Sequence, residues 1–127
     1  MPPPMRWLLH GNLAPAVADA LVRHEQKPQP MSDLGVAAEA SPREILKAAQ
    51  SKQLDVITAD SSLVNAIFDQ DIWFNRVVVF IQLEGGDVEQ DDAIDRLFER
   101  YKRLTPGRLY TVTGTRVKIR QLPHGRK

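Results

Sequence analysis

The chain has 127 residues, of which 43% are hydrophobic, so it suits one globular domain and is too short for two well-packed cores. It contains no cysteine, which excludes disulfides and cysteine-ligated metals and agrees with a reducing cytoplasm. No run of about 18 apolar residues is present, and the N-terminus lacks a signal-peptide pattern, so no membrane partner is expected. We expect a single cytoplasmic domain over residues 5–122, with flexible termini at 1–4 and 123–127.

The net charge of +1 hides an uneven distribution. Residues 1–95 hold 7 Lys/Arg against 15 Asp/Glu, whereas residues 96–127 hold 10 Lys/Arg against a single acid. The basic segment can be the solvated side of a helix and a hairpin, or it can be a surface that contacts phosphates of a nucleic acid. Charge alone leaves both interpretations open.

The first elements are a strand and a helix. A short apolar run over residues 6–10, closed by Gly11, predicts a buried strand. Asn12 is a good N-cap for a helix whose apolar positions recur at helical spacing as far as His24. The Lys-Pro-Gln-Pro sequence at 27–30 breaks that pattern.

The next elements follow the same order. A short second strand is predicted around Met31, ending near residues 33–35. The sequence Ser-Pro-Arg-Glu at 41–44 forms a capping box that starts a helix. Further along, strands are predicted at 54–59, 77–81, 109–112 and 116–120, and helices at 61–69, capped by Ser61 or Ser62, and at 91–104.

This alternation predicts an α/β fold, a three-layer α/β/α sandwich with a central mostly parallel sheet and a C-terminal β-hairpin. In such sheets, ligands bind at the carboxyl ends of the strands, near a reversal of strand order. The polar residues expected at that edge are His10, Asn12, Asp33, Glu44, Asp60 and Ser62.

Several chemistries are disfavoured. The first strand is not followed by a glycine-rich phosphate loop, no nucleophile elbow occurs, and the three histidines lack the spacing of zinc ligands. A receiver-like phosphoacceptor domain is disfavoured because no acidic residue follows the first strand. The remaining carboxylates suit Mg²⁺ or Mn²⁺, which supports hydrolysis of a phosphodiester by a metal-activated water.

Six segments of the chain form an ordered set of motifs: Trp7 to Pro15, Ser32 to Gly35, Ser41 to Leu46, Val56 to Leu63, Val77 to Leu83, and Gly107 to Pro123. In this order they resemble the motifs of a small bacterial PIN-like family related to the nuclease toxins of toxin–antitoxin pairs. The resemblance implies a PIN-like fold, Mg²⁺- or Mn²⁺-dependent ribonuclease activity, and partners such as RNA, an antitoxin-like protein or a second copy of the chain.

The chain departs from the family at two acidic positions. His10 stands where the family places an aspartate, and Ser62 stands where it places another. Glu44 and Asp60 are retained, and Asn12 also matches. By resemblance, Asp60 and Glu44 are the metal ligands, while the other three complete the catalytic set.

Two functional hypotheses follow. In the first, the chain is a PIN-like ribonuclease in which Asp60 and Glu44 hold the metal and Asn12 or Ser62 orients water or phosphate. In the second, it is a catalytically inactive PIN-like module that binds RNA or a protein. Each residue also has a structural interpretation: Glu44 belongs to the capping box, while Asp60 and Asn12 are possible helix caps.

Overall fold

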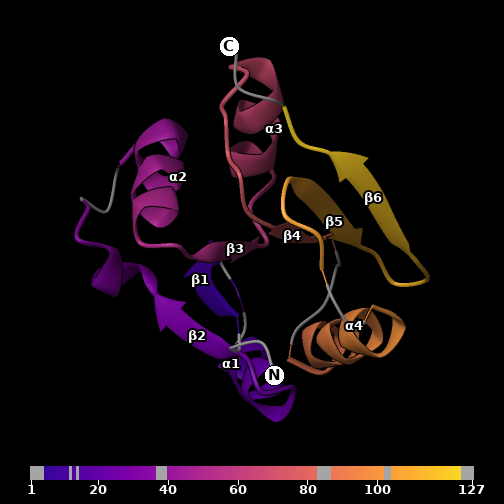
Figure 1. Cartoon of the computed structure of the whole chain (residues 1–127). Helices are drawn as coiled ribbons and strands as arrows, with labels where there is room; N and C mark the ends of the chain where they lie inside the picture. The colour runs from indigo at the N-terminus through magenta and orange to yellow at the C-terminus, as the bar shows by residue number, and fades with distance from the viewer. Residues whose placement is uncertain are drawn as a thin grey trace.

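The computed structural model describes residues 5–11, 13, 15–36, 40–82, 87–101 and 104–123. Strands and helices alternate along the chain, as the sequence predicts, and the last two strands form a hairpin (Figure 1). The elements are β1 (Arg6–His10), α1 (Pro15–Arg23), β2 (Lys27–Pro30), the 3₁₀ helix η1 (Met31–Leu34), α2 (Pro42–Ser51), β3 (Asp55–Thr58), α3 (Ser61–Asp69), β4 (Val78–Ile81), α4 (Asp87–Arg100), β5 (Arg108–Val112) and β6 (Val117–Gln121).

The six strands form one sheet in the order β2-β1-β3-β4-β5-β6. All neighbouring pairs are parallel except β5 and β6, which are antiparallel. The predicted mostly parallel sheet with a C-terminal hairpin is therefore confirmed. Because β2 lies on one side of β1 and β3 on the other, the strand order reverses at β1, and a ligand site is expected beside it.

Helices cover both faces of the sheet, so the predicted three-layer sandwich is also confirmed (Figure 1). Helices α2 and α3 pack on one face, where Leu46 and Ile67 join the core with Leu8 of β1. Helices α1 and α4 pack on the other, where Leu21 and Leu97 join Trp7. Each residue of β3 and β4 is buried, which explains why these strands are continuously apolar or β-branched apart from Asp55.

The second strand differs from the prediction. It covers Lys27–Pro30, the segment expected to interrupt the pattern, while Met31–Leu34 forms η1 instead of a strand. This strand lies at the edge of the sheet and pairs only with β1, where prolines are tolerated because one side of the strand needs no ladder hydrogen bonds. Its composition therefore gave no strand signal.

The boundaries of the last helix also differ. Helix α4 begins at Asp87 and ends at Arg100, whereas the apolar spacing predicts a helix over residues 91–104. Leu104 is buried in the same core as Leu97, but it lies outside the helix. Because Leu104 is buried, it extends the helical spacing of apolar residues beyond the last residue of the helix. Strand β6 is mostly exposed, not half exposed as its alternation predicts.

Within the described part of the chain, no helix has the length and apolar character needed to cross a membrane.

Candidate functional site

The carboxyl ends of β1 and β3 meet at the point where the strand order reverses. His10 and Thr58 are in register as the last residues of these strands. Gly11 then turns with a φ of 79°, in the left-handed region that favours glycine. A Cβ at Gly11 would lie 3.1 Å from Cβ of Asp60, so glycine also allows the two chain segments to approach closely.

A buried hydroxyl connects the ends of the two strands. Thr58 is fully buried, and its Oγ1 lies 2.8 Å from Nδ1 of His10. The same oxygen accepts a hydrogen bond from the backbone N–H of Asp60 at 2.9 Å. The two bonds satisfy the buried hydroxyl of Thr58. Together they fix the imidazole of His10 relative to the start of α3.

Asp60 is the N-cap of α3, so the prediction that Ser61 or Ser62 caps this helix is wrong. Its Oδ1 accepts a hydrogen bond from the backbone N–H of Ser62 at 2.9 Å. Among the described residues, none donates a hydrogen bond to the second carboxylate oxygen, Oδ2. The structural role of Asp60 in capping is therefore confirmed, and the cap bond uses only one of the two carboxylate oxygens.

The protonation of His10 depends on two opposing effects. Partial burial lowers the pKa of the imidazole below its ordinary value of 6.5, and the nearby Asp60 carboxylate raises it in part. Burial is the larger effect because water no longer solvates the charged form. The imidazole is therefore neutral at pH 7 and can accept or donate a proton through one of its nitrogens.

A pocket of about 510 Å³ opens beside these residues, a volume within the range typical of ligand sites. We call it the rim pocket. It combines an apolar wall from η1 and α2 with polar groups from the ends of β1 and β3 and the start of α3. The lining residues are His10, Gly11, Met31, Ala40, Pro42, Ile45, Asp60, Ser62 and Leu63.

The structure brings three of the five predicted site residues together. His10, Asp60 and Ser62 line the rim pocket, whereas Glu44 does not, although its neighbours Pro42 and Ile45 do. Asn12 lies outside the described residues. Asp33, which the sequence places at the same edge, is exposed in η1 and is not part of the lining.

Glu44 forms the capping box that the sequence predicts. Its Oε1 accepts a hydrogen bond from the backbone N–H of Ser41 at 3.1 Å, and Oγ of Ser41 accepts one from the backbone N–H of Glu44 at 3.2 Å. Since α2 begins beside the pocket, Glu44 lies at the same edge of the sheet as Asp60. Its carboxylate is exposed and engaged in the cap.

The donors in the rim pocket fit a weakly held hard cation. Asp60 offers one carboxylate oxygen and Ser62 a hydroxyl, and Mg²⁺ or Mn²⁺ commonly binds one or two protein oxygens while water and substrate phosphates complete its coordination. The imidazole of His10 is a poor ligand for such a cation and suits proton transfer better. These protein groups therefore fit the ion only if phosphate oxygens of the substrate complete its coordination.

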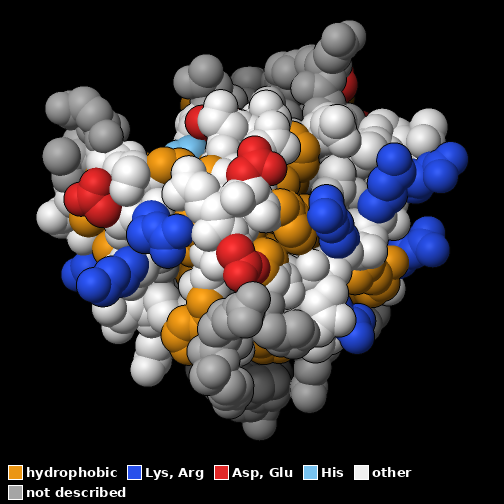
Figure 2. Space-filling view, turned by 90° about the horizontal axis from the view of Figure 1, so that it is seen from above, with side chains coloured by type: hydrophobic (Ala, Val, Ile, Leu, Met, Phe, Trp, Pro, Cys, Tyr) orange, Lys and Arg blue, Asp and Glu red, His pale blue; other side chains and the backbone are white. Residues whose placement is uncertain are grey.

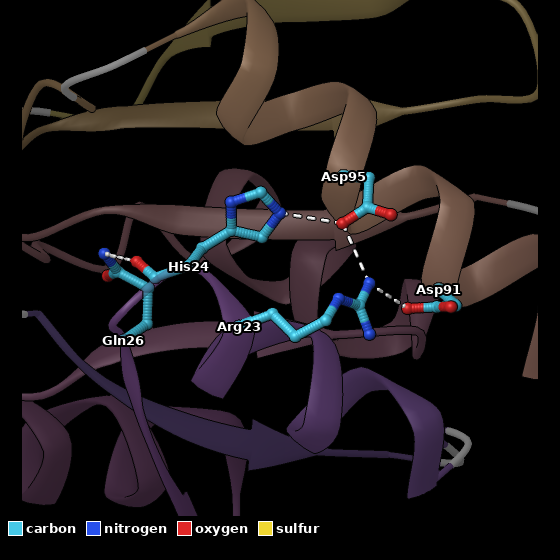
Figure 3. A network of polar contacts seen from close by, with 5 residues as sticks. All are labelled: Arg23, His24, Gln26, Asp91 and Asp95. Atoms are coloured by element: carbon cyan, nitrogen blue, oxygen red, sulfur yellow. Dashed lines mark hydrogen bonds and ion pairs between the residues drawn. The ribbon is translucent and has the colours of Figure 1, made fainter.

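A separate acidic cluster lies on α4. Among the described residues, Asp91, Asp92 and Asp95 place carboxylate oxygens within 4.8 Å of one another. Arg23 on α1 bonds Asp91 at 2.6 Å and Asp95 at 2.9 Å, and Nε2 of His24 donates to Asp95 at 2.7 Å (Figure 3).

These bonds offset part of the cluster's charge. The hydrogen bond from His24, followed by the contact with Arg23, lowers the pKa of Asp95 below its ordinary value. The ring of His24 also stacks on Phe98, with 5.2 Å between ring centroids. The cluster therefore serves to hold α1 against α4.

The basic residues of the C-terminal segment do not gather at the rim pocket. On the side covered by α2 and α3, Lys and Arg side chains form two groups separated by acidic side chains (Figure 2). Lys118 and Arg120 lie on β6, three strands away from β3, and the guanidinium of Arg120 lies 3.7 Å from the ring centroid of Phe68. None of the basic residues in the described part of the chain lines the pocket.

Sequence reasoning assigned no role to Thr58. A threonine in a buried strand has an ordinary packing explanation, because its methyl group suits a β-sheet. The available signal was its position as the last residue of a strand, two residues before the capping Asp60. That spacing allows a side-chain oxygen to accept the backbone N–H two residues later.

Compared with models of known protein families, with curated proteins and with solved structures, the chain matches none of them.

Proposed function

We propose that this chain is a PIN-like ribonuclease that cleaves RNA at the rim pocket with the help of Mg²⁺ or Mn²⁺. The observation that carries this proposal is the carboxylate of Asp60, which lines a pocket at the reversal of strand order beside a neutral imidazole and uses only one of its two oxygens for the helix cap. The order of the sequence motifs supports the same lineage, as does the α/β sandwich with its C-terminal hairpin.

The residues of the pocket have separate roles in this mechanism. Asp60 would hold the ion through Oδ2, and Ser62 would donate its hydroxyl hydrogen to a phosphate oxygen. When bound, the ion activates water and screens the charge of the phosphate. His10, fixed by Thr58, would take the proton of the attacking group or return one to the leaving oxygen.

Glu44 would act from the border of the pocket. Its Oε1 accepts the Ser41 backbone N–H, so it can contribute to the ion through its other oxygen or through a water. Because Glu44 acts from this indirect position, we expect its substitution to lower the cleavage rate less than substitution of Asp60.

The test is cleavage of single-stranded RNA with increasing Mn²⁺, comparing wild type with Asp60→Asn. We expect the cleavage rate of the variant to be lower by about 100-fold or more. Residues that only orient a metal ligand already cost up to about 100-fold in activity when they are replaced, and Asp60 is proposed as a ligand itself. Asparagine is as good an N-cap as aspartate, so the fold should persist. Asp69→Asn, which changes an exposed acid at the far end of α3, should cleave like wild type.

A non-catalytic module is the second candidate. Two observations favour it: both retained carboxylates act as helix caps, and a histidine ends β1 where the family has an aspartate. Absence of cleavage at any Mn²⁺ concentration, with RNA binding unaffected by Asp60→Asn, would select this function and reject the nuclease. The predicted partners of such a module, besides RNA, are an antitoxin-like protein and a second copy of the chain.

A further inference from the structure

The amino edge of the sheet, opposite the rim pocket, carries cations at or near the ends of several elements, and all of them except the half-buried Arg6 are exposed. Lys27 and Arg6 begin β2 and β1 and are in direct register. Arg108 begins β5, and Arg120 lies opposite Leu109 near the end of the antiparallel β6. Lys52 caps the end of α2, just before β3, and its carbonyl accepts a hydrogen bond from the Arg6 guanidinium.

These cations are not neutralised within the described part of the chain. Lys27, Lys52 and Arg108 are exposed and form no ion pair there. Like charges in register on neighbouring strands destabilise a sheet, and no described acid forms an ion pair with Arg6 or Lys27. An external anion would offset these like charges.

An exposed tryptophan lies in the segment that leads to this edge. Trp73 belongs to the segment that links α3 to β4, and it is 54% exposed. Two residues later, the backbone N–H of Asn75 donates to Gln50 in the last turn of α2. The carbonyl of Gln70, by contrast, accepts a hydrogen bond from Arg43 in the first turn of that helix. The segment therefore runs along α2 toward the amino edge. A large ring exposed to this extent can stack against a base.

We propose that this amino-edge surface binds the backbone of a single-stranded nucleic acid. The surface comprises Arg6, Lys27, Lys52, Trp73, Arg108 and Arg120. It extends across five inter-strand spacings, or about 24 Å. Cations that follow the backbone, combined with an aromatic side chain that stacks on a base, are the usual components of sequence-tolerant single-strand binding.

The acidic residues near this edge do not neutralise the cations of the amino-edge surface. Asp55 is buried in an ion pair, while Glu25, Asp69 and Asp71 are exposed at or just after the ends of α1 and α3. An acidic protein could also meet a basic row, but the exposed Trp73 favours a partner with aromatic bases. The surface does not include the rim pocket, so the inference goes beyond the proposed nuclease activity.

Binding should be measured with an oligodeoxythymidylate of about 12 nucleotides, within the usual range of site sizes, in EDTA. The probe is DNA and metal is absent, so cleavage at the rim pocket cannot contribute. Lys27→Gln/Arg108→Gln should weaken binding and make the slope of log K against log salt shallower by about 1.4, because each lost phosphate contact accounts for about 0.7.

The matched control is Arg116→Gln/Lys118→Gln, which removes one arginine and one lysine from exposed positions of the β5–β6 hairpin. It should retain the wild-type slope. An equal loss in both variants would show that binding follows net charge alone and would overturn the proposal. Absence of oligonucleotide binding at low salt, or binding of polyglutamate in its place, would also overturn it.

Tryptophan fluorescence provides an independent measurement. Trp7 is fully buried and Trp73 exposed, so quenching by the bound oligonucleotide should report on Trp73. Trp73→Phe should lose the quenching but retain most of the affinity, while Trp73→Ala should bind about tenfold more weakly because a base stack is lost. Quenching that persists in Trp73→Phe would contradict the assigned surface.

Discussion

Thr58 determines how the groups in the rim pocket lie relative to one another. Its hydroxyl bonds both the imidazole of His10 and the backbone of Asp60, so one buried oxygen fixes a side chain from β1 and the start of α3. The carboxylate of Asp60 then acts on His10 through its charge, without a direct hydrogen bond between them.

This arrangement predicts the direction in which the pKa of His10 responds to a substitution. The Asp60 charge raises that pKa against the larger effect of burial, so Asp60→Asn should lower it further. The imidazole resonances of His10, followed by NMR as a function of pH, measure the change. In wild type the midpoint should already lie below 6.5, the ordinary value for histidine.

Asp69→Asn is the control for this titration, since it removes the same charge from the opposite end of α3. It should leave the His10 midpoint unchanged. A midpoint that rises, or stays constant, in Asp60→Asn would mean that the two side chains do not interact as the structure indicates.

At the scale of elements, helix caps and ion pairs contribute unequally to the free energy of unfolding. The start of α2 is held by reciprocal hydrogen bonds between Ser41 and Glu44. Helices α1 and α4 are held partly by ion pairs of Arg23 with Asp91 and Asp95, whose side chains are about one-third to one-half exposed. Water and salt screen exposed pairs, so the cap should contribute more per interaction.

We therefore expect Ser41→Ala to lower the free energy of unfolding by about 1 kcal/mol, since it leaves a helical N–H without its acceptor. Arg23→Gln should lower it by less than about 1 kcal/mol, and by less still at high salt. Urea unfolding of both variants at low and high salt measures the two effects. A larger loss in Arg23→Gln would show that the α1–α4 contact depends on charge more than on its buried apolar residues.

At the scale of the whole molecule, much of the fold could be predicted from the sequence. The continuous apolar run of β4 and the capping box of α2 are local signals, and both led to the correct element. The edge strand β2 was misplaced because its pairing with β1 depends on tertiary context, which a Lys-Pro-Gln-Pro sequence does not reveal. The strand order could not be predicted either, since periodicity carries no information about neighbours.

The candidate site was predictable only in part, for the same reason. Strand ends could be located, so His10, Asp60 and Ser62 were expected at one edge, and they do line one pocket. Whether a side chain points into that pocket depends on its local bonds, and Glu44 is directed to its own helix start. The buried Asp55 received no role, because its bonds to Arg76 and the Val77 backbone form only when β4 packs beside β3.

The central claim is that a hard cation binds in the rim pocket, and paramagnetic broadening of backbone amide signals by Mn²⁺ tests it most directly. We predict that substoichiometric Mn²⁺ broadens signals around His10 and Gly11 and from Thr58 to Ser62, and that Asp60→Asn removes this effect. Broadening confined to the region of Asp91 and Asp95 on α4 would contradict the account.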